Sequence, residues 1–426
     1  MVMGSEIEYG IGVADGTPVN PVMLSEGVVT RVEGLGIGHL DRMLGNGARV
    51  YVDHAHPEYS GPECASATDV LTWELAGDAL LSSAATRLGQ ALGRPVVLHR
   101  NNTDGKGRSY GYHENYLLPR ALPWDDVVAQ LTGHLVSRVV LVGAGRVGLG
   151  QHGEQPGFQT SQRADFMERL EGIETTVRRP LVNTRDEPHA DRTRWRRLHV
   201  ITGDATLAHV ATLVKVGATA LVCAAIAAGT CRVPRLVDPL AAIRAFSRGL
   251  TLTTRQPCTD GVDRSALDLQ QLYLEASAPY AGTIADGALV LQHWAGLLDD
   301  ARRDPHLLAD RVDWAAKLAL LEGLGRRHGW GLDGPQAQAV DLQWHELDPA
   351  RGLGLKVAAA GRLQMLVGPA EVRAAMLTPP SGTRAQVRAR LLTQHQGRVV
   401  RADWAQLGIA SDRGIDWVDL PDPWGS

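Results

Sequence analysis

The sequence predicts an α+β fold, because strand patterns and helix patterns occupy different stretches of the chain. Residues 1–60 combine alternating apolar and polar side chains with glycine-rich connections, which is typical of strands. Residues 66–93 and 262–330 instead repeat apolar side chains at helical spacing. Strands followed by runs of helices favour the α+β class.

Shorter elements lie between and after these stretches. The expected elements are strands at 95–99 and 197–202, a turn-rich loop at 101–107, a helix over 123–141 that runs into a strand, and a helix from Asp204. The apolar run 218–228 predicts a buried core helix, because Gly229 ends it before it could span a bilayer. The stretch 349–352 separates an expected large domain, 1–352, from a small α+β domain, 353–426.

The length and composition are those of an ordinary globular protein. The 426 residues are 44% hydrophobic and 21% charged, and a net charge of −4 argues against a dedicated nucleic-acid binder. The four cysteines form neither a CxxC pair nor a zinc-finger spacing, and the start of the chain has no signal-peptide pattern. We therefore expect a protein of the reducing cytoplasm with neither nucleic-acid nor membrane partners. We also expect a monomer, although no sequence feature bears on the oligomeric state.

Two of the expected strands gather charged and polar side chains on one face, since side chains alternate along a strand. These side chains are Glu6 and Glu8 in residues 5–13, and Arg49, Tyr51 and Asp53 in residues 49–53, with Glu58 just beyond. Carboxylates on two strands suit a hard divalent cation, and such a cation usually carries a nucleotide phosphate. The two faces therefore predict a nucleotide–metal site.

A glycine-rich motif at 139–148 offers a competing interpretation. An apolar run enters Gly143-x-Gly145-x-x-Gly148, as in dinucleotide-binding folds. That fold needs a helix directly afterwards, and residues 149–157 are too rich in glycine to form one. A strand and turn in a mixed sheet is the preferred interpretation.

The pair His54 and His56 offers a second competing interpretation, a zinc site, because His-x-His occurs in zinc amidohydrolases. In the plainer interpretation, one histidine bonds the backbone of a turn and neither binds metal. Polar clusters at 112–116 and 185–191 could be solvated turns, but beside the acidic faces they favour a site. Arg163, and one arginine of the pair 196–197, could bind phosphate or carboxylate groups.

Taken in order, these motifs resemble those of the Pup ligase/deamidase family of carboxylate–amine ligases, which is related in fold to glutamine synthetase. The resemblance rests on residues 6–10, 46–60, 101–107, 113–116, 161–163, 183–191 and 196–204. It implies a glutamine-synthetase-like cradle of antiparallel and mixed sheet packed by helices. The spacing Asp53-His54-Ala55-His56-Pro57-Glu58 resembles the deamidase branch, because the ligase branch has one more residue before His-Pro-Glu.

The resemblance also implies a role for each candidate residue. Mg²⁺ would be held by Glu6, Glu8, Tyr51, Glu58, His113 and His189. The nucleotide, ATP or ADP with phosphate, would contact Arg49, Gly61, Arg197 and Trp404, with Trp404 packed on adenine. Asp53 would be the catalytic carboxylate, as a general base or a nucleophile, and Arg163 or Arg185 would hold carboxylates of the substrate.

The implied reaction is hydrolysis of the C-terminal glutamine amide of Pup, or of the isopeptide that joins Pup to a lysine of a pupylated protein. ATP would be a cofactor rather than a fuel, because amide hydrolysis needs no energy input. The alternatives are a Pup ligase, a zinc amidohydrolase and a nucleotide-dependent Pup-binding scaffold. One departure is that family deamidases carry a long insertion before residue 46, where this chain has only 16–44, with a compact join at 35–38.

Overall fold

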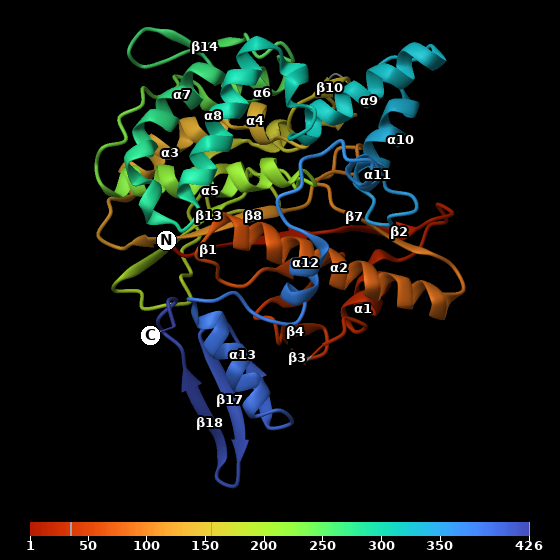
Figure 1. Cartoon of the computed structure of the whole chain (residues 1–426), viewed down its shortest axis with the longest axis vertical. Coiled ribbons are helices and arrows are strands. Elements are labelled where there is room, and N and C mark those ends of the chain that lie inside the picture. The colour runs from red at the N-terminus through yellow and green to blue at the C-terminus, as the bar shows by residue number, and fades with distance from the viewer. Residues whose placement is uncertain (35, 155, 426) are drawn as a thin grey trace.

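The computed structural model describes residues 1–34, 36–154 and 156–425, arranged as Figure 1 shows. Within these residues, a nine-stranded sheet has the strand order β11-β12-β13-β8-β1-β6-β5-β4-β3. Neighbouring strands are antiparallel, except for the parallel pair β11 and β12. Its strands are β1 (Met3–Glu8), β3 (Gly36–Ile37), β4 (Asp41–Leu44), β5 (Arg49–Asp53), β6 (His56–Ser60), β8 (Tyr112–Pro119), β11 (Arg169–Gly172), β12 (Pro180–Asn183) and β13 (Trp195–Val200).

The helices pack mainly against one another; many form a layer above this sheet, whereas the last one lies below it (Figure 1). They are α1 (Pro21–Val29), α2 (Ala67–Leu92), α3 (Trp124–Ser137), α4 (Val139–Val142), α5 (His209–Ala227), α6 (Pro239–Arg248), α7 (Ala266–Ser277), α8 (Gly287–Arg303), α9 (Asp313–His328), α10 (Pro335–Trp344), α11 (Leu353–Ala359), α12 (Pro369–Ala375) and α13 (Arg384–Gln394). The small sheets pair β2 (Gly10–Val13) with β7 (Val96–His99), β9 (Arg146–Val147) with β10 (Phe158–Gln159), β14 (Arg255–Pro257) with β15 (Asp263–Ser265), and β16 (Val399–Ala402) with β17 (Gln406–Ser411) and β18 (Gly414–Asp419). This mixture confirms the predicted α+β class.

Helix α5 lies at the centre of the helical layer. It packs against α2, α3, α7 and α8, and against strand β8 of the sheet. Among the described residues it is the one helix long and apolar enough to cross a membrane, yet 94% of its apolar stretch is buried inside the fold. The prediction of a buried core helix is confirmed. Its start was predicted too early, because the Asp313 carboxylate accepts the N–H groups of Leu207 and Ala208, both at 2.9 Å, and holds them outside the helix.

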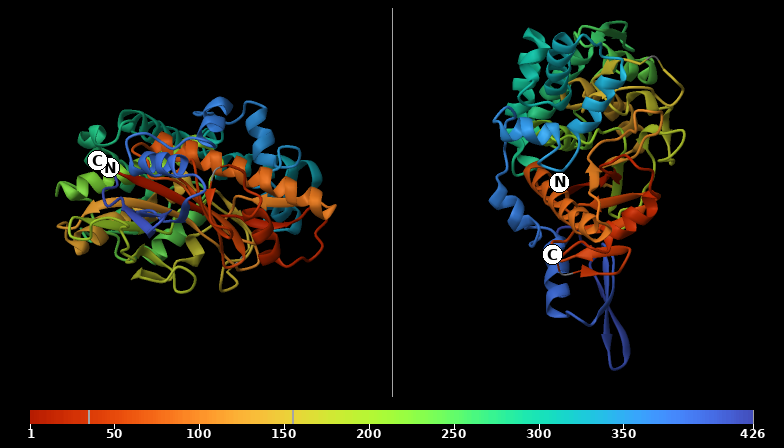
Figure 2. Two further views of the ribbon diagram at one scale, coloured as in Figure 1. Left: turned by 90° about the horizontal axis from the view of Figure 1, so that it is seen from below. Right: turned by 90° about the vertical axis from the view of Figure 1, so that its right-hand side faces the viewer.

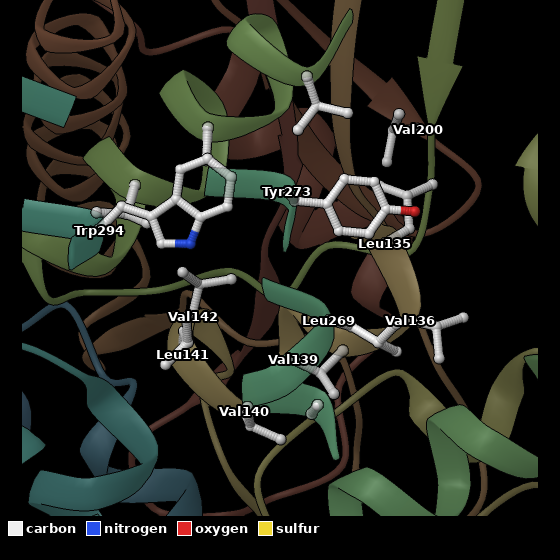
Figure 3. Packing of buried hydrophobic residues seen from close by; sticks show 14 of the residues in the cluster. Leu135, Val136, Val139, Val140, Leu141, Val142, Val200, Leu269, Tyr273 and Trp294 are labelled. Atoms are coloured by element: carbon white, nitrogen blue, oxygen red, sulfur yellow. The ribbon is translucent and has the colours of Figure 1, made fainter. Parts of the chain in front are cut away.

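The strand predicted at the end of 123–141 is wrong, because Val139–Val142 forms the short helix α4. The carbonyl of Arg138 accepts the N–H groups of Leu141 and Val142 at 2.9 and 3.0 Å, which continues the helical course after α3. All four side chains are buried, so packing imposes no alternation of faces (Figure 3). The two-residue strand β9 lies within the glycine motif, and the described residues among 149–157 form no helix, in agreement with the rejection of the dinucleotide-binding interpretation.

Helix α1 was not predicted within residues 1–60. Its signals are local: Asn20 caps the first turn by accepting the N–H of Val22 at 3.0 Å, and Pro21 stands at the first helical position. The compact join predicted at 35–38 lies partly outside the described residues, since residue 35 is not among them. Gly36 and Ile37 form β3.

The last part of the chain forms a unit of α13 with strands β16 to β18, which projects away from the helical layer (Figures 1 and 2). Leu392, Val399 and Leu407 of this unit pack with Met43 of β4. Helices α11 and α12 instead lie on the main body, with α12 against α2. The domain boundary after residue 352 stays a prediction.

Candidate active site

The candidate site lies on one face of the sheet and is centred on β1. Glu6 and Glu8 project from β1 while Ile7 is buried on the other side, as the alternation predicted. In the neighbouring ladders, Glu6 is opposite His113 of β8, and Glu8 is opposite Glu58 of β6. The sheet register therefore places residues that are far apart in sequence on one surface.

The first group of possible metal ligands consists of Glu6, His113 and His199. His113 Nδ1 lies 3.1 Å from Glu6 Oε2, and His199 Nε2 lies 3.9 Å from the same oxygen. Burial alone would raise the pKa of Glu6, but the His113 hydrogen bond and the charges of His199 and His113 lower it below its usual range. Both ring nitrogens of His199 are buried without a hydrogen-bond partner, which is an unfavourable state that a bound cation relieves.

The second group consists of Glu8, Asp53 and Glu58, and it offers oxygen ligands alone. Burial and the nearby carboxylates of Glu6 and Glu8 raise the pKa of Glu58 well above its usual value. Burial also raises the pKa of Tyr51, which faces Glu58 across the β5–β6 ladder. Three convergent carboxylates fit a hard cation such as Mg²⁺, whereas the mixed nitrogen and oxygen set of the first group also suits Mn²⁺.

Sequence reasoning missed His199. Because Arg197 and His199 are two apart on β13, they share a strand face, and the choice of Arg197 could have led to its neighbour. His189, which was assigned to the metal, lies in neither ligand group among the described residues. It lies beside Arg197 in the adjacent pocket, so its metal role stays a prediction that the geometry does not favour.

A pocket adjoins Glu6, which forms part of its wall. Gly61 and Arg197 form part of its wall on the sheet side, and Trp404 closes it from the C-terminal unit. The Arg197 guanidinium donates to the Asn115 side chain at 3.0 Å and lies 3.7 Å from Glu6 Oε1. Arg196 turns instead towards Asp186, in accord with the prediction that one of the two arginines faces the site.

A buried ionic group attaches the C-terminal unit to this pocket. The Glu63 carboxylate accepts hydrogen bonds from Arg384 and Arg388, and Arg388 also donates to the Trp404 carbonyl at 2.9 Å. The Arg388 guanidinium lies over the Trp404 ring, 5.0 Å from its centre. Arg388 therefore fixes the position of Trp404, and Trp404 forms part of the pocket wall.

The remaining predicted arginines lie in different environments. Arg49 pairs with Asp41 of β4 at the margin of the site. Arg163 is 1% exposed and donates to the Tyr110 and Ile201 carbonyls at 2.7 and 3.0 Å, and burial lowers its pKa to about 9. It supports a loop, so the geometry does not favour its substrate role. Arg185 is exposed near Glu187, where the structure leaves it accessible.

The two histidines of the His-x-His motif do not converge. His54 Nδ1 lies 3.0 Å from Asp53 Oδ1, whereas His56 Nδ1 donates to the Tyr9 carbonyl at 2.9 Å. Neither histidine belongs to a ligand group in the described part of the chain. The geometry therefore favours the plainer interpretation over a zinc site.

Comparison with known proteins identifies the family. The family model described as Pup-ligase protein matches residues 1–408. The chain is 45% identical over 380 residues to a depupylase of Acidothermus cellulolyticus, with 87% of this chain and 75% of the relative covered. It is 38% identical over 452 aligned positions to a Pup deamidase/depupylase of Mycobacterium tuberculosis (95% and 90% covered), and 37% identical over 444 to a Pup–protein ligase of Micrococcus luteus (99% and 95%). The chain belongs to the Pup-ligase family.

Solved structures agree with this assignment. The fold matches the crystal structure of the complex between the prokaryotic ubiquitin-like protein Pup and its ligase PafA, with a TM-score of 0.89, 31% identity and coverage of 99% and 89% of the two chains. It also matches PafA in complex with ADP, with a TM-score of 0.82, 32% identity and coverage of 93% and 88%. The predicted family and fold are confirmed, and members of this family named as deamidases and as ligases both resemble the chain.

Proposed function

We propose that this protein is an ATP- and Mg²⁺-dependent amidohydrolase that deamidates the C-terminal glutamine of Pup and cleaves Pup–lysine isopeptide bonds. The observation that carries the proposal is the two-residue turn between Asp53 and His56, which pair directly at the end of the β5–β6 hairpin. This spacing resembles the deamidase branch of the family. The 45% identity to a depupylase supports the same choice.

The proposed cofactors fit the residues that are present. The ADP complex of PafA supports a bound nucleotide, and we assign it to the pocket lined by Gly61, Arg197 and Trp404. The residues that would hold Mg²⁺ come from the two ligand groups, with Tyr51 beside them: they are Glu6, Glu8, Glu58, His113 and His199. When bound, the cation would supply positive charge near the reacting amide, and the nucleotide would supply a fixed framework.

Asp53 is the proposed catalytic carboxylate. Its side chain is 39% exposed at the turn of the β5–β6 hairpin, where a peptide amide can approach it. As a nucleophile it would displace ammonia or a lysine amine from the amide carbon, and water would then release the acid. As a general base it would take a proton from water during direct attack. Both routes leave a Pup glutamate and a free amine.

The first experiment is incubation of the protein with Pup that ends in glutamine, together with ATP and Mg²⁺, followed by intact-mass measurement. Conversion of the amide to an acid without proportional ADP release supports the proposal. Pup that ends in glutamate, with a protein acceptor, tests the ligase instead. Conjugates formed in proportion to ADP would overturn the amidohydrolase assignment.

An Asp53→Asn variant tests the catalytic carboxylate. Turnover should fall by at least about 10³-fold, because the group that performs the chemistry is removed, while nucleotide affinity is kept. Asp15→Asn is a matched control, since Asp15 is a surface carboxylate paired with Arg94. Equal activity of Asp53→Asn and the wild-type protein would refute the role of Asp53.

A Pup ligase is the second candidate. The 37% identity to the Micrococcus luteus ligase spans 99% of the chain, and both matched structures are of PafA. Absence of activity in both the deamidation and the ligation assay would instead support a nucleotide-dependent Pup-binding scaffold. We further propose that the protein acts in the cytoplasm as a monomer.

A further inference from the structure

We propose that His56 and Tyr110 form a clamp that positions the Asp53 carboxylate for reaction. The inference rests on the proposed function, since it adds positioning residues to the same site. His56 is the partner of Asp53 across the hairpin, and His54 and Ala55 form the turn between them. His54 adopts a φ of 51°, a conformation that costs a side chain of this kind free energy and needs support from its surroundings.

The Asp53 side chain has little of its own to hold it. Its contact is with His54, whose side chain is 67% exposed, and an exposed pair of this kind contributes little. The position of the carboxylate therefore depends on the course of the backbone through the turn. Asp53 and His56 lie at opposite ends of the same two-residue turn. Contacts that fix His56 therefore also fix the position of Asp53.

The imidazole of His56 is hydrogen-bonded to the backbone just after the end of β1. Its Nδ1 lies 2.9 Å from the Tyr9 carbonyl oxygen, at the break between β1 and β2. A carbonyl can only accept, so Nδ1 carries the hydrogen. Helix α1 also holds the turn, because the Ser25 hydroxyl donates to the Ala55 carbonyl at 2.9 Å.

The ring of Tyr110 closes the clamp from the other side. It stacks on His56 with ring centres 4.4 Å apart and an angle of 26° between the planes. The Tyr110 hydroxyl donates to the Asn101 side chain, and the Tyr110 N–H donates to the Asn102 carbonyl at 3.1 Å. The buried Arg163 guanidinium holds the Tyr110 carbonyl at 2.7 Å. Arg163 thus acts on the site through Tyr110.

Paired substitutions separate the two nitrogens of His56. In His56→Asn the amide N–H replaces Nδ1 and can still reach the Tyr9 carbonyl, whereas in His56→Gln the longer side chain replaces Nε2. For Tyr110, Tyr110→Phe keeps the stacked ring and Tyr110→Leu removes it. Tyr280→Leu is a matched control, because Tyr280 makes one hydroxyl contact, with Thr230 at 2.7 Å, in the helical layer.

The expected result is a loss of kcat with unchanged KM for Pup and unchanged nucleotide affinity. Tyr110→Leu and His56→Gln should lose about 10- to 100-fold in kcat, the range typical of residues that orient reacting groups. His56→Asn and Tyr110→Phe should retain more activity than their partners, and Tyr280→Leu should match the wild type. If Tyr110→Leu fails to fold, the other three site variants still decide the question.

Two results would overturn the clamp. Wild-type kcat in Tyr110→Leu and His56→Gln would show that the stack positions nothing. A His56→Gln variant more active than His56→Asn would show that Nε2 touches the substrate and that His56 is catalytic. If the wild-type protein forms conjugates instead of removing the amide, the proposed function fails, and the same variants test the clamp through the rate of ligation.

Discussion

Glu8 and Glu58 are direct partners across the β1–β6 ladder, so two carboxyl groups face each other on the same side of the sheet. Like charges in this position oppose folding unless a proton or a cation lies between them. The site is therefore built at a cost in stability, and binding of a cation can recover that cost.

The first prediction is that Mg²⁺ stabilises the protein more at high pH than at low pH. The raised pKa of Glu58 means that the folded state binds more protons than the unfolded state above 4.5, so stability without metal falls as pH rises through the folded pKa. Thermal unfolding between about pH 5 and about pH 8 should show a falling Tm and a growing shift on adding Mg²⁺. Glu58→Gln should weaken both trends, and identical profiles for the two proteins would contradict this account.

The second prediction separates two histidines. His199→Asn should weaken Mn²⁺ binding, because an unpartnered imidazole of the first group is lost. We expect a loss of about 10- to 100-fold in affinity, the range seen even for residues that merely support a ligand. His189→Asn should leave the affinity for the free cation unchanged. Calorimetric titration of both variants without nucleotide provides the measurement. The reverse order of affinities would restore the assignment of His189 made from sequence.

The third prediction concerns the nucleotide. Trp404→Ala should weaken ATP binding by about 1–3 kcal/mol, the usual contribution of an aromatic ring stacked on a base. Trp417 of β18 is 47% exposed and absent from the pocket wall, so Trp417→Ala is a matched control in the same unit. Equilibrium binding of a fluorescent ATP analogue measures both. Equal losses in the two variants would place the base elsewhere.

The fourth prediction is that Glu63 links stability to nucleotide binding. Burial alone would raise its pKa, but Arg388 and Arg384 lower it to about 2, so its contribution is present above 4.5 and is lost as pH falls from 4.5 towards 2. Glu63→Gln should destabilise the protein by about 3–5 kcal/mol at neutral pH, because two buried guanidinium groups lose their counter-charge.

Urea unfolding measures this loss, and Asp260→Asn is its control. Asp260 pairs with Arg264 on the surface, where the loss should stay within about 1 kcal/mol. ATP affinity should also fall in Glu63→Gln, since Arg388 holds the Trp404 carbonyl. Unchanged stability in Glu63→Gln would show that the buried charges find other partners.

Much of this molecule could be predicted because its signals are local. The alternation around Glu6 and around Tyr51 identifies the side chains on the site face without knowledge of the neighbouring strands. Helix α2 follows from its periodic leucines, its Ser66 cap and the left-handed Gly93 at its end. These features depend on residues within a few positions of one another.

The rest depends on tertiary contacts that a single sequence does not display. His199 enters the site because β13 pairs with β8, and the choice of register cannot be read from either strand alone. Val139–Val142 has strong strand propensity, yet a fully buried position after α3 makes it helical. Arg163 stands within the Ser-Gln-Arg motif, but its guanidinium is occupied by carbonyl groups of the fold.

The walls of the proposed nucleotide pocket join the two ends of the described chain, from Val2 through Asn115 and Arg197 to Pro423. During synthesis, a ribosome must reach the last few residues before these walls can meet. A nascent or truncated polypeptide thus has no complete pocket, however well its sheet has folded. Occupancy of the pocket would report that the chain has been made and assembled at least as far as Pro423, so a nucleotide-dependent rise in Tm would measure the molecules in a preparation that contain both ends of the pocket wall.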